Sequence, residues 1–344
     1  MKRHLNTLYV TSQGSWLGKE SETVVVQVDG VTRLQLPLIS LESIVCFGRV
    51  SCSPPLMHAC SERGVSISFL SEHGRFLAKV VGPISGNVLL RREQYRRADD
   101  LGAGSAIARA IVVAKIANAR SSVLRSLRDR PDPENSEGIR VRAARQLAAL
   151  MDQLDAPVTM DALRGYEGSC ARVYFEGLDE MITQQKESFF FSARSRRPPL
   201  DNVNAMLSLV YTLVMHDLIG ALEGVGLDPA VGFLHTDRPG RPSLALDLME
   251  EMRPWLADRF VLALINLRQL SATDFMKDEA RGVTLTDEGR RRFLTAYQKR
   301  KQEEITHPFL GEKITIGLLP HIQALLLARH LRGDLDGYPP FIWK

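Results

Sequence analysis

The first 82 residues follow the two-residue period of β-strands. Residues 65–70 alternate between polar and apolar side chains, and two β-rich runs within 23–36 flank Asp29-Gly30, a dipeptide that favours a hairpin. The same pattern predicts strands at 5–10, 43–47 and 75–81, a turn at His73-Gly74 and a short helix at 53–63. We therefore expect a small β-strand domain over residues 1–82. It carries no pattern typical of chemistry, which suits a scaffold or a dimerisation module.

From residue 87 onward the apolar period lengthens to that of helices. Because residues 94–100 are charged, we place an interdomain linker at 83–100. Beyond it, the pattern predicts helices at 103–130, 139–154, from Thr159 onward, 202–223, from Ser243 onward, 254–270, 286–304 and 314–332. The expected fold class is α+β, with a small N-terminal β-strand domain followed by a larger all-α domain over residues 101–344. An aromatic tail at 338–344 is expected to dock on the body or on a partner.

Composition narrows the class of protein only slightly. A chain of 344 residues with 44% hydrophobic and 24% charged residues is an ordinary globular protein, and its net charge of +4 is weak evidence for a polyanionic partner. The local distribution of arginine is more informative. One cluster alone suits a solvated helix face, but several together favour phosphate contacts: 91, 92, 96 and 97; 120, 125, 128 and 130; 194, 196 and 197; 290, 291 and 292.

The cysteines and the termini indicate a cytoplasmic protein. The four cysteines have no metal-ligand spacing, so free thiols in a reducing compartment are expected. The N-terminal residues lack the apolar run of a signal peptide. Pro320 and His321 interrupt the most apolar window, 314–327, which is too short to span a bilayer.

A histidine and an acidic pair mark the stretch 231–254 as a candidate site. An apolar lead delivers His235, a loop rich in Pro, Gly and Arg follows, and Ser243 is expected to cap the next helix. Asp247 and Glu250 are three residues apart, so on a helix they project from one face. The other positions are apolar, so the two carboxylates need a partner. A shared divalent cation is one explanation, and an ion pair with a nearby arginine is the other.

A second candidate acid lies in the helix that begins at Thr159. Gly165 and Gly168 flank Glu167, although a glycine in a helix interior costs about 1 kcal/mol relative to alanine. That cost predicts close approach of a neighbouring element or a ligand around Glu167. Tight helix packing alone would explain the glycines but not the acid.

These motifs together resemble a known family, the metal-dependent DNA endonuclease and integrase that inserts new spacers during CRISPR adaptation. The resemblance covers essentially the whole chain. Within the family, the chain is similar to the forms that accompany type I systems, such as the I-C kind. The motifs occur in the family's order: GYEGSCARVYF at 165–175, RRPPLDNVNAMLS at 196–208, GLDP at 226–229, GFLH at 232–235, SLALDLME at 243–250 and Arg-Pro at 253–254.

The resemblance implies a set of metal ligands. Glu167 matches the family's first acidic ligand and His235 its histidine. The third falls at Asp247 or Glu250; the family often has Asp at the later position, where this chain has Glu250, and we take Glu250 as the direct ligand with Asp247 as its neighbour or a second ligand. Oxygen ligands with one imidazole suit Mg²⁺ or Mn²⁺.

The resemblance also implies a reaction. A bound metal can activate water for strand cleavage, or a DNA 3′-hydroxyl for transesterification that integrates a spacer. Candidate phosphate contacts, each equally open to an ordinary ion pair, are Arg196, Arg197, Arg238 and Arg253. Asn204 and Tyr211 are expected to support the site rather than to perform chemistry.

The implied partners are double-stranded and branched DNA, a second copy of the chain, and a small ferredoxin-like CRISPR adaptation protein flanked by two such dimers. Two other functions remain open. A non-catalytic DNA-binding assembly protein would explain the arginine clusters but not the acids and the histidine together. A metal-dependent phosphoesterase for small substrates would use similar ligands, usually on an α/β scaffold without a separate β-domain.

Overall fold

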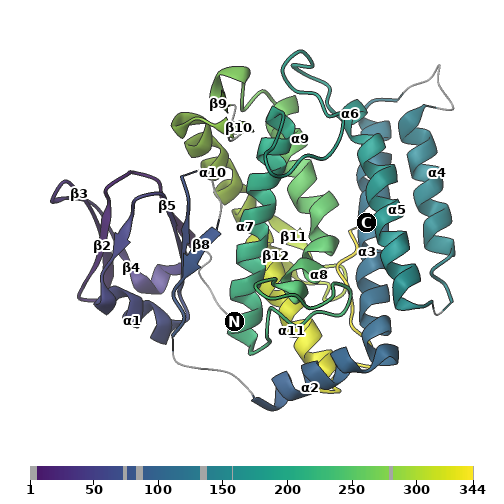
Figure 1. The fold of residues 1–344 in the computed structure, drawn as a ribbon, viewed down its shortest axis with the longest axis horizontal. Helices are drawn as coiled ribbons and strands as arrows, with labels where there is room; N and C mark the ends of the chain where they lie inside the picture. The colour runs from purple at the N-terminus through teal and green to yellow at the C-terminus, as the bar shows by residue number, and fades with distance from the viewer. Residues whose placement is uncertain are drawn as a thin grey trace. The chain divides into compact units, whose positions relative to one another are not determined.

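A computed structural model describes residues 6–72, 76–82, 88–131, 138–156, 158–278 and 282–343 (Figure 1). Contacts divide the chain into two compact units. Unit 1 comprises Met1–Ser85, Leu285–Glu304 and Thr315–Leu318, and unit 2 comprises the rest. The predicted α+β class, with strands first and helices after them, is confirmed.

Unit 1 contains two four-stranded sheets. One has the order β1-β5-β7-β8 and the other β4-β3-β2-β6. Their bounds are β1 Asn6–Val10, β2 Trp16–Glu20, β3 Thr23–Val28, β4 Val31–Pro37, β5 Leu41–Phe47, β6 Ser51–Cys52, β7 Ser66–Leu70 and β8 Phe76–Lys79. The expected hairpin at Asp29-Gly30 joins β3 to β4, and both turn residues have positive φ, as a two-residue hairpin turn with the right twist requires.

Apolar side chains of both sheets share one core with helix α1, Pro54–Arg63. Ser53 caps this helix by accepting a hydrogen bond from Leu56 N, and Gly64 ends it in the left-handed conformation, as expected. Helix α10, Asp287–Gln302, also belongs to this unit. Its Lys301 donates to Thr7 of β1.

Several expectations from the sequence differ from the structure. Helix α10 and residues 315–318 were expected in the helical domain, but α10 packs on β1 and so belongs with the strands. The expected linker contains helix α2, Val88–Asp99, because Leu90 and Gln94 of its charged sequence face inward and are buried. Strands β2 and β6 were not predicted. The turn at His73-Gly74 and residues 83–87 of the expected linker lie outside the described residues.

Unit 2 is built from helices around α3 and α7 (Figure 1). Its elements are α2, α3 Leu101–Asp129, α4 Ile139–Asp152, α5 Met160–Glu176, α6 Leu178–Met181, α7 Asn202–Val225, α8 Ser243–Met252, a π-helical turn η2 Arg253–Asp258, α9 Arg259–Asn266 and α11 Leu319–Leu331. Two short strand pairs join them, β9 Phe275–Asp278 with β10 Gly282–Leu285, and β11 Glu304–Thr306 with β12 Lys313–Thr315.

Helices α3 and α7 are both long and apolar enough to cross a membrane by length and composition. In the structure they are core helices: α3 packs against α4, α5 and α8, and α7 against α8 and α11. Half or more of the apolar window of each helix is buried. Packing against other helices therefore accounts for their apolar composition.

The aromatic tail docks on unit 2. Asn118 of α3 donates to the carbonyls of Glu251 and Phe341, and Trp343 N donates to Asn118 Oδ1. Glu251 accepts hydrogen bonds from Tyr338 Oη and from Phe341 N at 2.7 and 2.8 Å. Burial raises the pKa of Glu251 to about 8, and these hydrogen bonds only partly offset that effect. The tail thus fastens α3 to α8 at the residue after Glu250.

Candidate metal centre

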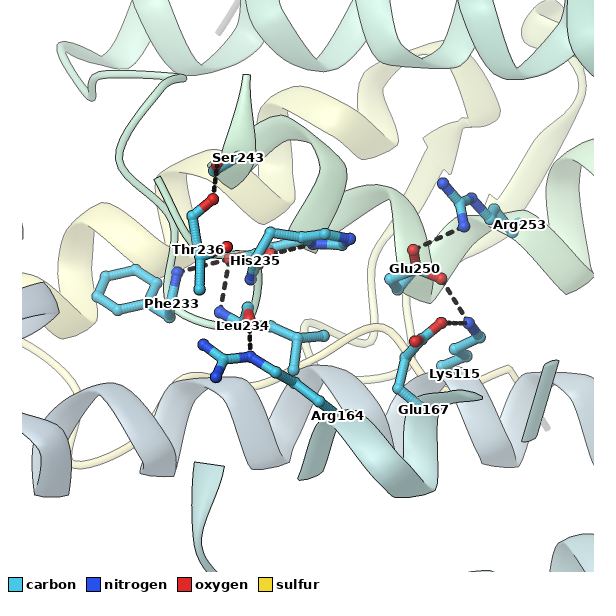
Figure 2. A network of polar contacts seen from close by, with 11 residues as sticks. Lys115, Arg164, Glu167, Phe233, Leu234, His235, Thr236, Ser243, Glu250 and Arg253 are labelled. Atoms are coloured by element: carbon cyan, nitrogen blue, oxygen red, sulfur yellow. Dashed lines mark hydrogen bonds and ion pairs between the residues drawn. The ribbon is translucent and has the colours of Figure 1, made fainter. Parts of the chain in front are cut away.

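Two helices deliver the acidic side chains of the site. Glu167 lies on α5, which Thr159 caps by accepting from Ala162 N, and Glu250 lies on α8. Both carboxylates meet the same ammonium group, Nζ of Lys115 on α3 (Figure 2). Lys115 binds Glu167 through a short hydrogen bond and lies 2.8 Å from Glu250 Oε2. Three helices therefore converge on one cation.

Glu250 is buried, with its side chain 1% exposed, and its charge is balanced on both sides. Arg253 Nη1 lies 2.7 Å from Glu250 Oε1, and Lys115 covers the other oxygen. Burial alone would raise the pKa of Glu250, but the charges of Arg253 and Lys115 outweigh it and hold the pKa well below the ordinary value. Each oxygen of Glu250 thus faces one cationic side chain, Oε1 that of Arg253 and Oε2 that of Lys115.

The histidine is held by a carboxylate. His235 lies in the loop between α7 and α8, and its Nδ1 is 2.6 Å from Asp247 Oδ1. With the proton on Nδ1, the lone pair of Nε2 is free to bind a metal, which is the usual arrangement of a metal-binding histidine. A coulombic effect of His235 also contributes to the low pKa of Glu250, so the two side chains are close enough to interact electrostatically.

Asp247 organises the whole histidine loop. Its Oδ2 accepts from the backbone amides of Phe233 and Leu234, and its Oδ1 accepts from that of His235 at 3.0 Å. The side chain is fully buried. With the imidazole included, four donors use its lone pairs, so Asp247 suits the positioning of His235 better than direct contact with a metal.

Close packing shapes the loop around Asp247. A Cβ on Gly232 would lie 2.8 Å from Asp247 Oδ2 and 2.9 Å from the backbone of Ser243, so only glycine fits here. Arg164 of α5 donates to the carbonyl of Leu234 and ties the loop to the helix that carries Glu167 (Figure 2). The expected N-cap role of Ser243 is wrong, because its hydroxyl donates to the carbonyl of Thr236 and Pro242 precedes the helix.

Of the two explanations for the glycines beside Glu167, close approach of a neighbouring element is wrong, and a ligand there stays a prediction. A Cβ added to Gly165 or to Gly168 would meet nothing within 4 Å among the described residues. Glu167 itself is 26% exposed, unlike Glu250. The glycines therefore leave open space next to the more accessible carboxylate rather than admit a neighbouring helix.

The four candidate arginines fall into two groups. Arg196, Arg197 and Arg238 are exposed, and within the described residues none of them forms an ion pair. Arg253 is instead paired with Glu250, and its guanidinium lies 5.1 Å from the ring centre of Tyr211. The structure therefore brings Arg253 to the acidic site and leaves the other three on loops.

Asn204 and Tyr211 support surrounding groups, as expected. Asn204 Oδ1 accepts from Arg194 Nη1 and from Ser195 N, which anchors the arginine-rich loop to α7. Tyr211 donates to Asp258 and lies against the Arg253 guanidinium. The second contact helps to hold the arginine that pairs with Glu250.

Sequence reasoning missed Lys115. Its one signal is a lone lysine within the apolar run 111–117 of a core helix. Burial of a lysine is unfavourable unless carboxylates face it, which could have indicated a buried acidic site nearby.

The residues present fit a divalent metal, although in the described ranges no three His, Cys, Asp or Glu side chains lie close enough together to enclose one. The donor set of two carboxylates and one imidazole is chemically suitable, and both oxygens of Glu250 already face positively charged groups. Two carboxylates and an imidazole brought together from separate elements define a candidate divalent-metal site.

Comparison with known proteins identifies the family. Residues 8–299 match the family described as CRISPR associated protein Cas1. The chain is 53% identical over 344 residues to a CRISPR-associated endonuclease Cas1 of Chlorobaculum tepidum, with all of both chains covered. This protein belongs to the Cas1 family of CRISPR-associated endonucleases.

Solved structures share the fold. A chain of a Cas6-RT-Cas1–Cas2 complex has a TM-score of 0.82 at 23% identity and covers 98% of this chain, which spans 36% of it. A casposase bound to an integration product has a TM-score of 0.83 at 22% identity, with 98% and 94% of the two chains covered. These likenesses confirm the arrangement of strands and helices.

Proposed function

We propose that this enzyme cleaves DNA strands and integrates short duplex DNA at a divalent metal, Mg²⁺ or Mn²⁺, held by Glu167, Glu250 and Nε2 of His235. One observation carries the proposal: carboxylates from α5 and α8, 83 positions apart in the chain, meet at one cation, with an Asp247-backed imidazole nearby. When bound, the metal would supply Lewis-acid activation of a phosphodiester and of a water or a 3′-hydroxyl.

Each residue of the proposed metal site has a separate role. Glu167 and Glu250 would bind the ion, and His235 would complete the ligand set with an orientation fixed by Asp247. Arg253 fixes Glu250 and brings positive charge toward phosphate oxygens. Open space beside Gly165 and Gly168 leaves room for a polymeric substrate at the exposed side of Glu167.

A supercoiled-plasmid assay tests this function. Incubation with a short duplex ending in 3′-hydroxyls should give covalently joined product with Mn²⁺ or Mg²⁺ and none with EDTA, in the presence of the small adaptation protein. Joining without divalent metal would contradict the proposal. Binding of the duplex without joining under any condition would favour a non-catalytic assembly protein, and hydrolysis of nucleotides but not of branched DNA would favour a phosphoesterase.

The exposed arginines are proposed DNA contacts. Arg196, Arg197 and Arg238 are exposed and, within the described residues, have no carboxylate partner, so their guanidinium groups can bind phosphates. We expect alanine at both Arg196 and Arg197 to weaken duplex binding and to lower the slope of log affinity against log salt by about 1 to 2. Anisotropy titrations at several salt concentrations measure this. Arg172→Ala, which removes an exposed arginine already paired with Glu176, is the control and should leave the slope unchanged.

Unit 1 is proposed to mediate homodimerisation. Strand β4 is the edge of its sheet, and Val31 and Leu34 on it are 52% and 39% exposed. An open edge with apolar side chains is suited to contact with a second copy. Light scattering of the full chain should give a dimer, and Leu34→Lys should shift it to monomer, whereas Arg33→Lys should not. A monomer at all concentrations of the unaltered chain would contradict this.

We further propose that two such dimers assemble with a small ferredoxin-like adaptation protein on the spacer and repeat DNA, in the cytoplasm. The support is the family to which the chain belongs, together with the fold that it shares with a chain of a Cas1–Cas2 complex. The free state of all four cysteines suits a reducing compartment. Co-elution of the two purified proteins with duplex DNA tests the assembly.

A further inference from the structure

The ammonium group of Lys115 lies between Glu167 and Glu250, where a metal ion shared by these two carboxylates would also lie. Its side chain is 6% exposed and lies in the apolar interior of α3, between the fully buried Ala114 and Ile116. Its ammonium group faces one carboxylate from each of two helices, Glu167 of α5 and Glu250 of α8, and links them (Figure 2).

The charges of this cluster are balanced without any metal. Glu167 and Glu250 contribute two negative charges, and Lys115 and Arg253 contribute two positive ones. A divalent ion added to all four would place four positive charges against two negative ones in a largely buried site. Such an excess is strongly unfavourable in a low-dielectric interior. Withdrawal of one of the two cationic side chains from the carboxylates would relieve this excess.

Of the two, Lys115 is the one whose flexible stem lets its charged group move. Arg253 pairs with Glu250, and the ring of Tyr211, itself hydrogen-bonded to Asp258, holds its guanidinium in place. The Lys115 ammonium contacts both carboxylates and lies at the end of a flexible four-carbon side chain. The ammonium also blocks the space between the two carboxylates, which is the space that a bridging metal needs.

We propose that Lys115 is an exchangeable internal cation: it holds Glu167 and Glu250 together in the metal-free protein and is displaced when the divalent metal enters. This inference rests on the metal centre proposed above. Metal binding is then an exchange of one cation for another. Helices α5 and α8, which carry the two carboxylates, stay folded before the metal binds. The affinity for the metal is lower than the carboxylates alone would give. Lys115 is thus a positioning residue that sets the metal affinity.

Metal binding to the purified full chain tests the exchange without any DNA. We expect Lys115→Met to raise the affinity for Mn²⁺, measured by calorimetry, by at least about tenfold, because the competing charge is gone. Lys115→Arg, which keeps the charge, should stay within about threefold of the unaltered chain. In EDTA, Lys115→Met should melt at a lower temperature, and added Mn²⁺ should raise that temperature by more than it does for the unaltered chain. Unchanged or weaker Mn²⁺ binding by Lys115→Met would overturn the proposal.

A measurement on the unaltered chain covers the case in which Lys115→Met fails to fold. Mn²⁺ should increase the rate at which an amine-reactive acylating reagent modifies Lys115, detected by mass spectrometry with the other lysines as internal references. An equal rate with and without Mn²⁺ would show that the ammonium stays in place and would overturn the exchange. If instead the unaltered chain and the Glu250→Gln variant bind Mn²⁺ equally well, the proposed metal centre is wrong and both proposals fail.

Discussion

Replacing Glu250 with glutamine is expected to remove nearly all strand cleavage and integration, at any metal concentration. The amide keeps the size of the side chain but binds a hard cation poorly, and it cannot balance Arg253 and Lys115, which both face this buried group. Glu250→Asp should retain measurable activity, because it keeps the charge and shortens the side chain by one methylene.

Integration assays over a range of Mn²⁺ concentrations measure this effect. Glu176→Gln, on the same helix as Glu167 but exposed and paired with Arg172, is the matched control and should behave as the unaltered chain. Thermal melts separate loss of a ligand from loss of the fold. Full activity of a folded Glu250→Gln protein would contradict its assignment as a metal ligand.

The second large effect is expected at Asp247, for a different reason. Asp247→Asn places an amide group where two buried oxygens now accept from Phe233 N, Leu234 N, His235 N and the imidazole. At least one donor then loses its acceptor, which costs about 1–3 kcal/mol of folding free energy. The imidazole also loses the carboxylate that fixes its tautomer. We expect activity to fall by about 10–100-fold.

High Mn²⁺ distinguishes the two acids. Asp247→Asn keeps both proposed carboxylate ligands, so raised Mn²⁺ should recover part of its activity, whereas Glu250→Gln should not recover. Urea unfolding should also show lower stability for Asp247→Asn. Recovery of Glu250→Gln with none for Asp247→Asn would exchange the two roles and leave the rest of the mechanism intact.

The sequence predicts the helices and strands of this protein better than it predicts which of them pack together. The hairpin at Asp29-Gly30 and the helix that begins after Thr159 form as expected, because each depends on residues close in the chain. Helix α2 differs from the expected linker because its buried positions, Leu90 and Gln94, are too few for a helical period to stand out among its charges. The placement of α10 with the β-strands depends on packing across the whole chain length, which no local period encodes.

The candidate site shows the same limit. The resemblance singled out Glu167, His235 and the acidic pair, but spacing alone could not say what each of the pair faces. Although Asp247 and Glu250 are one turn apart, Asp247 faces the backbone amides of the histidine loop and Glu250 faces two cations. Lys115 could not be linked to either acid, since 52 residues separate it from Glu167.

The docked tail has a consequence for synthesis on the ribosome. Phe341 N and Tyr338 Oη both bind Glu251, and Asn118 of α3 pairs with the backbone of Phe341 and Trp343. A nascent chain that has emerged only as far as α8 already carries every proposed ligand but lacks the segment that fastens α8 to α3. These bonds cannot form until residue 341 leaves the exit tunnel. The fastening of α8 to α3, one residue from Glu250, therefore forms only after residues 338–343 have been synthesised, when the strands of unit 1 have long been available to fold.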